Sequence, residues 1–414
     1  MIVTVTLNPA LDLTYAVDAL VPHGTHRVAR VTERPGGKGL NVARVLHALG
    51  EPVLATGLLG GVTGDRVATL LGQEGVRSSF VRIAAETRRT VAVVDPADAT
   101  GFWEPGPTVT PAEWSLFVAE FRELLGPATV VALSGSLPPG VPIDGYATLI
   151  ALANAIGVPT VLDTSGPALR AGLAAGPTLA KPNTAELAAL LSAPTVTALA
   201  QAGPAKAGLA QAERAQAERA KAGPAQAERT LAERAQAGPA QAKPAQAEQA
   251  QAEPAQAKPA QAEPGGDIAP GRLGSRDAGP EAGRARRPGP LGLADAVRGV
   301  AAGPVVVSRG TAGLLAITAD EVWECVPPAP VDGNPTGAGD ACVAALARGL
   351  RDHTPWPDLL PDAVALSAAA VAAPVAGAFD PDVYRRTRAT VSAALAPATP
   401  APPAVGGTHA RIHR

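Results

Sequence analysis

Residues 334–340 read Asn-Pro-Thr-Gly-Ala-Gly-Asp and stand directly before an apolar run. Gly337 and Gly339 allow backbone conformations that expose amide groups, and a helix that begins here adds the positive end of its dipole. The amides of Gly337, Ala338 and Gly339 are therefore a candidate anion hole. Asp340 is placed to take a proton from a hydroxyl that attacks a bound phosphate. An aspartate that only caps the helix is the alternative interpretation.

A second glycine-rich segment, Gly-Gly-Lys-Gly-Leu-Asn, occupies residues 36–41. Its glycines, Gly37 among them, let the backbone approach a ligand, and a helix predicted from about Leu40 would direct its N-terminus to the same place. Lys38 supplies a compact phosphate-binding charge, and Asn41 supplies a paired donor and acceptor. The spacing is not that of a Walker A loop. A purely structural helix start is the alternative.

Lysine and asparagine are rare in this chain, which supports a functional role for the ones in these glycine-rich segments. Outside one Ala-rich stretch, Lys38 and Lys181 are the only lysines of the chain, and four of its five asparagines stand in the segments singled out by their glycine and proline neighbours. A chain that rarely uses Lys or Asn needs their chemistry where it places them beside Gly and Pro. Lys181 and Asn183 are therefore candidates for the same site.

Polar residues also follow or begin several predicted strands. Asp12 comes after the strand of residues 2–7, where open α/β sheets bind ligands, so it could hold sugar hydroxyls or simply cap a turn. Ser136 lies in a rigid polar loop at residues 134–140. Arg88, at the head of a strand, could bind a second phosphate or remain solvated. Ser308, Gly310 and Gly313 punctuate a hairpin that could support an adenine and ribose, with a plain β-turn as the alternative.

Strands and helices alternate through most of the chain, which predicts a mainly parallel sheet with right-handed crossovers. The predicted strands are residues 2–7, 53–59, 87–94, 129–133, 158–163, 305–308 and 314–318. The predicted helices are one from about Leu40, residues 64–74, 111–125, 144–155, 293–301, 340–350 and 360–373, and a last one from Pro381. Residues 179–187 are predicted to be a short strand that opens a helix. Thr164-Ser165-Gly166 is predicted to be a polar turn.

Composition excludes several classes of function. The net charge of -2 and pI near 6.3 argue against a nucleic-acid partner. No run of about 18 apolar residues occurs, so no membrane partner is expected. The N-terminus resembles a strand and lacks the features of a signal peptide, and the two cysteines are too few for a disulfide framework. A cytoplasmic location is therefore expected.

The alternation stops between residues 193 and 290, where Ala, Gln, Glu, Arg and Pro repeats replace the apolar residues. A segment with so few Val, Ile and Phe cannot form a core, and its recurring prolines break long helices. We expect a disordered insertion, with a helical partner-binding arm as the lesser alternative. Residues 396–414 are expected to be a flexible tail.

Taken in order, these motifs resemble the PfkB carbohydrate kinases. The resemblance covers residues 1–192 and 291–395 and rests on five segments: Thr-Leu-Asn-Pro-Ala-Leu-Asp at 6–12, Gly-Gly-Lys-Gly-Leu-Asn-Val-Ala at 36–43, Ser-Gly-Ser-Leu-Pro-Pro-Gly at 134–140, Lys-Pro-Asn at 181–183 and Thr-Gly-Ala-Gly-Asp at 336–340. It implies a ribokinase-like α/β fold: a three-layer α/β/α domain with a mainly parallel sheet. A small β-sheet lid from about residues 13–34 and 88–104 is also implied, often pairing in homodimers.

The resemblance also implies roles for individual residues. Asp340 would be the base, with the amides of residues 337–339 stabilising the transferring phosphoryl group. The sugar phosphate would be bound by Asp12, Gly37, Lys38, Asn41, Arg88, Arg27 and Ser136. Asn183 and Glu186 would organise Mg²⁺ and the ATP phosphates, with Lys181 near the nucleotide and residues 308–313 bordering it. One departure is Arg309, which stands where the family usually has an apolar residue.

The first and third segments are most similar to the hexose-phosphate branch of the family, which includes 1-phosphofructokinase and tagatose-6-phosphate kinase. We therefore expect ATP- and Mg²⁺-dependent phosphorylation of fructose 1-phosphate, with tagatose 6-phosphate or fructose 6-phosphate as the next candidates. A non-catalytic sugar-phosphate sensor is the alternative from a different class. A nicotinamide-dependent oxidoreductase is disfavoured because no Gly-x-Gly-x-x-Gly follows the first strand.

Overall fold

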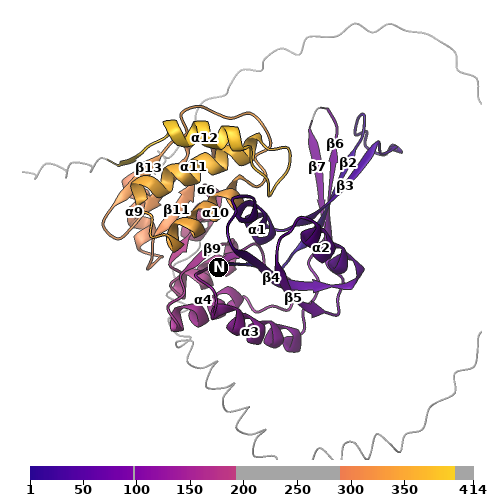
Figure 1. Ribbon diagram of the computed structural model, residues 1–414, viewed down its shortest axis with the longest axis horizontal. Helices are drawn as coiled ribbons and strands as arrows, with labels where there is room; N and C mark the ends of the chain where they lie inside the picture. The colour runs from indigo at the N-terminus through magenta and orange to yellow at the C-terminus, as the bar shows by residue number, and fades with distance from the viewer. Residues whose placement is uncertain (97, 193–289, 397–414) are drawn as a thin grey trace, which may run out of the picture. The chain divides into compact units, whose positions relative to one another are not determined.

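The computed structural model describes residues 1–96, 98–192 and 290–396 of the 414-residue chain. These residues belong to one compact unit, Met1–Ala193 with Arg287–Arg414, which is shown in Figure 1. The insertion predicted at residues 193–290 lies almost entirely outside the described residues, as does the tail predicted at 396–414. Both therefore stay predictions.

A ten-stranded sheet forms the centre of this unit, in the order β14-β13-β12-β11-β10-β9-β8-β1-β4-β5. All pairs from β11 to β5 are parallel, whereas β12, β13 and β14 add an antiparallel edge. The strands are β1 (Ile2–Thr6), β4 (Val53–Gly60), β5 (Ser78–Ile83), β8 (Val130–Ser134), β9 (Thr160–Asp163), β10 (Leu179–Ala180), β11 (Val305–Ser308), β12 (Leu314–Ile317), β13 (Val322–Cys325) and β14 (Ala393–Leu395).

Helices cover both faces of the sheet because successive strand residues point to opposite sides. Ile2 packs in a core with Leu40 and Ala344, whereas Val3 packs in a second core with Phe117 and Tyr146. The first face is covered by α1 (Lys38–Ala48), α2 (Gly61–Gln73), α10 (Ala338–Arg351), α11 (Trp356–Ala372) and α12 (Pro381–Thr390). The second is covered by α3 (Pro111–Leu125), α4 (Gly145–Ala155), α5 (Gly166–Ala174), α6 (Thr184–Ser192) and α9 (Pro290–Arg298). The predicted three-layer α/β/α architecture is confirmed.

A separate four-stranded sheet carries the order β3-β2-β6-β7, with β2 (Ala10–Ala16), β3 (Arg30–Gly36), β6 (Arg88–Val94) and β7 (Ala99–Trp103). Its strands lie together beside α2 in Figure 1. The central pair β2–β6 is parallel and the two outer pairs are antiparallel, so the sheet is mixed. All of β7 is exposed. The small sheet predicted from residues 13–34 and 88–104 is present, although residues 17–29 connect its strands and are not strands themselves.

Several predicted boundaries were wrong for physical reasons. The helices predicted from Leu40 and Asp340 begin at Lys38 and Ala338, so the glycine segments themselves form the first turns. The turn predicted at residues 164–166 instead leads into α5, because Gly166 adopts a φ of 59° and Pro167 favours the first turn of a helix. The strands β5, β13 and β14 were not predicted: β5 and β14 are the edge strands of the sheet, and β13 and β14 are only four and three residues long, which leaves little periodic signal.

Candidate active site

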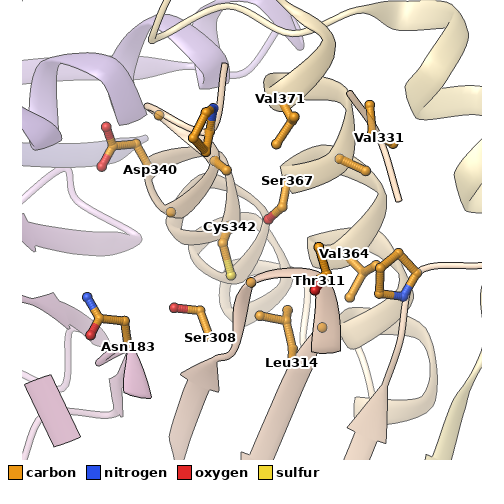
Figure 2. A pocket seen from close by; sticks show the side chains of 18 of the residues that line it. Asn183, Ser308, Thr311, Leu314, Val331, Asp340, Cys342, Val364, Ser367 and Val371 are labelled. Atoms are coloured by element: carbon orange, nitrogen blue, oxygen red, sulfur yellow. The ribbon is translucent and has the colours of Figure 1, made fainter. Parts of the chain in front are cut away.

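The candidate site lies at the carboxyl ends of the parallel strands, where α1 and α10 begin. A cavity of about 660 Å³ opens there, and its lining combines residues from distant parts of the chain. Those predicted from sequence are Lys38, Asn41, Lys181, Asn183, Ser308, Gly310, Gly313, Gly337, Ala338, Gly339 and Asp340. Figure 2 shows part of this lining, with Asp340 and Asn183 on the polar side. The structure therefore gathers the predicted catalytic residues and most predicted nucleotide residues in one cavity.

The turn before α10 requires glycine. Gly337 caps the helix with a φ of 93°, in the left-handed region that other residues rarely adopt. A Cβ atom at this position would also lie 3.0 Å from Ala376 Cα, so the turn packs closely against the loop after α11. Within this turn the Ala338 amide donates to the Pro335 carbonyl at 3.2 Å, whereas the Gly337 and Gly339 amides remain available at the cavity. This geometry can bind an anion.

Asp340 lies in the first turn of α10 and is only 6% exposed. Its Oδ2 accepts a hydrogen bond of 2.8 Å from Nδ2 of Asn41 on α1. Burial and the nearby Asp163 raise the pKa of Asp340 to about 7, and the opposing effects of Asn41, Lys38 and Lys181 only limit the rise. Near neutral pH this carboxylate can therefore exchange a proton with a bound hydroxyl.

Asp163 was missed by the sequence analysis, and it links both lysines. Its Oδ1 lies 3.3 Å from Nζ of Lys38 and 3.3 Å from Nζ of Lys181. Burial opposes charge on Lys181, but the nearby carboxylates outweigh it, so the pKa of Lys181 is raised. Asp163 ends the buried strand β9, and a carboxylate at the carboxyl end of a parallel strand was the available signal.

Asn183 and Glu186 form a reciprocal cap at the start of α6. Oδ1 of Asn183 accepts from the Glu186 N–H, and Oε2 of Glu186 accepts from the Asn183 N–H, both at 2.8 Å. The other carboxylate oxygen of Glu186 lies 3.8 Å from Nζ of Lys38. Asn183 therefore fixes the direction in which Glu186 points.

No group of three or more His, Cys, Asp or Glu residues in the described part of the chain could hold a metal ion alone. Asp163 and Glu186 nevertheless face the same lysine, and the buried Oδ2 of Asp163 has no hydrogen-bond partner. Two carboxylates that leave room for water and phosphate oxygens suit Mg²⁺. These residues thus fit the predicted Mg²⁺, with Asp163 in addition to the predicted pair of Asn183 and Glu186.

Of the predicted sugar-binding residues, Lys38 and Asn41 line the large cavity, whereas Asp12, Arg88 and Ser136 form a second group outside its lining. Asp12 on β2 accepts from the Thr90 hydroxyl on β6. Burial raises the pKa of Asp12 although Thr90 and Arg88 oppose it. Nη2 of Arg88 donates to the Asn8 carbonyl at 3.2 Å, and Nδ2 of Asn8 contacts the Ser136 hydroxyl at 3.1 Å.

The remaining two predicted sugar-binding residues differ in their placement. Gly37 adopts a φ of 111° at the N-cap of α1, where a Cβ atom would approach Thr6 to 2.8 Å. It therefore lets the start of α1 pack directly against Thr6 at the carboxyl end of β1. Arg27 lies exposed in the connection between β2 and β3 and is not part of either group.

The part of the cavity beside the predicted nucleotide hairpin has a more apolar lining than the sequence suggested. Gly313 adopts a φ of 77° and packs against the Cys325 carbonyl, where a Cβ atom would be 2.0 Å from the oxygen. Side chains from α11 and from the segment after β13, among them Val331, Val364 and Val371, complete the lining (Figure 2). These residues were not predicted because an apolar position on a buried helix carries no sign of ligand contact. The cavity is thus polar at one end and apolar at the other.

Arg309 folds back onto the hairpin. Its Nη2 donates to the Ala312 carbonyl and to Oε1 of Glu324 on β13, each at 2.7 Å. Among the described residues, the cavity lining does not include Arg309. This departure from the family's usual apolar residue therefore stabilises the turn and leaves the cavity open.

The family model of the pfkB family carbohydrate kinases matches residues 5–212 and 292–382. This chain belongs to the PfkB family. The match covers the segments that carry Lys38, Asn183 and Asp340, and the protein is a sugar kinase.

Solved structures support the fold. Phosphofructokinase-2 from Escherichia coli, in complex with potassium, is 24% identical with a TM-score of 0.67, covering 94% of this chain and 98% of that chain. The same enzyme in complex with fructose-6-phosphate is 25% identical with a TM-score of 0.65 and the same coverage. A possible 1-phosphofructokinase from Thermotoga maritima is 19% identical with a TM-score of 0.65, covering 96% of this chain and 99% of that chain. The ribokinase-like fold is therefore confirmed.

Within the described ranges, none of the helices has the length and apolar character needed to cross a membrane.

The burial of Asp340 predicts a pH-dependent effect on stability. Because its pKa is raised from 3.8 to about 7, the stability contributed by its shift is fully present below the unfolded pKa and is lost as pH rises through the folded value. Asp340→Asn removes the buried charge and can still accept from Asn41. We expect the variant to gain more in Tm over the wild type at about pH 8 than at about pH 5.

Thermal unfolding at the two pH values measures this difference. Asp295→Asn is the control, because that side chain is 82% exposed and its ion pair with Arg298 should contribute little. If Asp340→Asn changed the Tm by the same amount at both pH values, the claim that burial raises the pKa of Asp340 would be contradicted.

Proposed function

We propose that the protein transfers the γ-phosphoryl group of ATP to a hydroxymethyl group of a ketohexose phosphate. Fructose 1-phosphate is the proposed substrate and fructose 1,6-bisphosphate the product. The observation that carries the proposal is the buried carboxylate of Asp340 in the first turn of α10, beside exposed amides and two lysines that pair with Asp163. A base, an anion hole and cations at one point meet the needs of phosphoryl transfer.

In the proposed reaction, the oxygen of the substrate hydroxyl attacks the γ-phosphorus, and Asp340 accepts the proton of that hydroxyl. The new O–P bond forms while the bond to the bridging oxygen of ADP breaks, and ADP leaves with that electron pair. Asn41 holds the carboxylate of Asp340 in position through its 2.8 Å hydrogen bond. The amides of residues 337–339 and the ammonium groups of Lys38 and Lys181 stabilise the negative charge of the transferring group.

Asp163 and Glu186 are the residues proposed to hold Mg²⁺ together with the ATP phosphates, with Asn183 positioning Glu186. When bound, the ion neutralises phosphate charge. Nζ of Lys38 lies 3.3 Å from Oδ1 of Asp163 and 3.8 Å from Oε1 of Glu186. Its positive charge is therefore placed to offset the two negative charges before Mg²⁺ and ATP bind.

The cavity supports ATP as the phosphoryl donor because its two ends differ in polarity. Ser308, Gly310 and Gly313 border the hairpin, and the valines of α11 offer an apolar surface to a base. The polar end, with Asn183 and Lys181, suits the phosphates. Asp12, Arg88 and Ser136 are proposed for the sugar phosphate, and exposed Arg27 is proposed to reach its phosphate. A cytoplasmic location is proposed because these substrates are cytoplasmic metabolites.

A coupled ADP-release assay with Mg-ATP against fructose 1-phosphate, fructose 6-phosphate and tagatose 6-phosphate tests the proposal. We expect turnover with a preference for fructose 1-phosphate. A preference for either other sugar would keep the kinase and overturn the proposed substrate. Asp340→Asn should reduce kcat by about 10²- to 10⁴-fold and still bind the sugar phosphate.

Two outcomes of this assay would contradict the proposal more deeply. Full activity of Asp340→Asn would exclude Asp340 as the base. Silence of the wild type on all three sugars, with binding still detectable by thermal shift, would favour the sugar-phosphate sensor.

We also propose that two copies pair through the small sheet. Phe102 on β7 and Val31 on β3 lie on the same face of this sheet, and their side chains are 57% and 54% exposed. Exposed apolar residues on one face of a small sheet are suited to burial against a second copy. Phosphofructokinase-2 from E. coli, which is 24% identical to this chain, has been solved in a tetrameric inhibited form, so this similar protein forms oligomers.

Phe102→Glu should convert a dimer to a monomer, because the interface would have to bury an unpaired carboxylate. Light scattering after size-exclusion chromatography measures the mass. Leu116→Glu on α3, where the native side chain is 50% exposed, is the matched control and should keep the dimer. A monomeric wild type, or a Phe102→Glu variant that stays dimeric, would contradict this interface.

A further inference from the structure

Arg44 is a buried arginine that the proposed mechanism does not use. It lies on α1, one turn after Asn41, and is 6% exposed. Its Nε and Nη2 bind the two carboxylate oxygens of Glu74 at 2.5 Å and 3.1 Å, and its Nη1 donates to the Ala376 carbonyl at 2.9 Å. A planar guanidinium held at three points has a fixed orientation.

The carbonyl that Arg44 holds belongs to a loop that touches the anion hole. Gly377 adopts a φ of 75°, and a Cβ atom there would lie 2.5 Å from Nη1 of Arg44 and 2.9 Å from Oδ1 of Asn41. On its other side the loop meets Gly337, where a Cβ atom would lie 3.0 Å from Ala376 Cα and 3.3 Å from the Gly377 nitrogen. The loop is thus packed between α1 and the turn that begins α10.

Packing alone does not fix this loop on all sides. A second cavity of about 280 Å³ lies against it and is lined by Arg44, His47, Glu74, Gly377 and Phe379, among others. A loop with open space beside it can move if its polar anchor is lost. The hydrogen bond from Arg44 to the Ala376 carbonyl therefore restrains the loop on the side of this cavity, where no side chain of the described residues packs tightly against it.

Glu74, which follows the last turn of α2, fixes Arg44 in turn. The same helix carries Arg66, whose Nε lies 2.6 Å from Oε2 of Glu33 on β3 of the small sheet. Two separate ion pairs therefore join α2 to its neighbours, at Arg66 to the small sheet and at Glu74, through Arg44, to α1 and the loop after α11. Glu74 is 32% exposed, so the buried member of the pair is Arg44.

We propose that Arg44 is a positioning residue for phosphoryl transfer. By holding Ala376 against Gly337, it sets the placement of the anion hole and of Asp340 relative to Asn41. This inference rests on the proposed function, because it assigns Arg44 a role in that same reaction. Arg44 itself touches no proposed substrate atom.

The test compares Arg44→Met and Arg44→Lys with Arg348→Met. Arg348 is a matched control because it is also largely buried and paired, at 2.7 Å from Asp362 and 2.9 Å from the Tyr384 hydroxyl, far along α10 from the turn. Thermal unfolding establishes how much stability each variant loses. Steady-state kinetics then separates kcat from KM.

We expect Arg44→Met to lower kcat by about 10- to 100-fold, because small misplacements of reacting groups are costly. Its KM values should stay within about threefold, and Arg348→Met should keep kcat within about twofold at a similar loss of Tm. Arg44→Lys should recover part of kcat, since an ammonium can keep the bond to Ala376 without the fork to Glu74. If Arg44→Met kept the wild-type kcat, or lost no more than Arg348→Met, the proposal would be overturned.

Hydrogen exchange provides a readout that needs no turnover. The Ala338 and Ala341 amides, which donate to the Pro335 and Gly337 carbonyls, should exchange faster in Arg44→Met and not in Arg348→Met. Unchanged exchange would overturn the proposal. An inactive wild type would contradict the proposed function, and the exchange comparison would then decide the positioning role alone. If Arg44→Met does not fold, Glu74→Gln, which keeps Arg44 and Ala376, replaces it and should show a smaller change in the same direction.

Discussion

The two lysines that share Oδ1 of Asp163 govern the charge balance of the whole site. Asp163 and Asp340 are both buried, and the charge of Asp163 adds to burial in raising the pKa of Asp340. Lys38 and Lys181 offset that cost, one from α1 and the other from the end of β10. Removal of either lysine would leave the two buried carboxylates with only one neighbouring ammonium group, so Asp340, the proposed base, depends on residues far from it in sequence.

The fold brings these groups together by a simple geometric constraint. Parallel strands end at one edge of the sheet, and the helices that follow them begin there, so carboxylates, amides and lysines converge. The loop after α11 packs closely against both α1 and the turn before α10 because Gly377 and Gly337 lack side chains there. The same closeness makes the positions of Asn41 and Asp340 sensitive to the loop after α11, which Arg44 holds. On the proposed account, contacts outside the cavity thus set the position of Asp340, the proposed base.

Sequence reasoning identified the groups whose chemistry is unusual for their surroundings. Lys38, Asn41 and Asp340 stood out because glycines accompany them, and α3 was predicted with its observed bounds from its amphipathic pattern. The structure adds a capping box of Thr110 and Glu113 at its start. Asp163 was missed because one aspartate after a buried strand resembles any turn residue. The apolar lining from α11 and the role of Arg44 were also missed, since both depend on contacts between segments more than 300 residues apart or on a buried helix face.

The central claim is that Asp340 acts as a base with a pKa near neutrality, and the pH dependence of kcat/KM tests it most directly. Between about pH 5.5 and about pH 8.5, activity should fall as pH decreases through a midpoint near 7, where Asp340 becomes protonated. Asn41→Leu removes the hydrogen bond that lowers this pKa, so its midpoint should lie higher. Titration of the substrate phosphate affects both proteins equally. Identical midpoints in the two proteins, or a flat wild-type profile, would contradict the account.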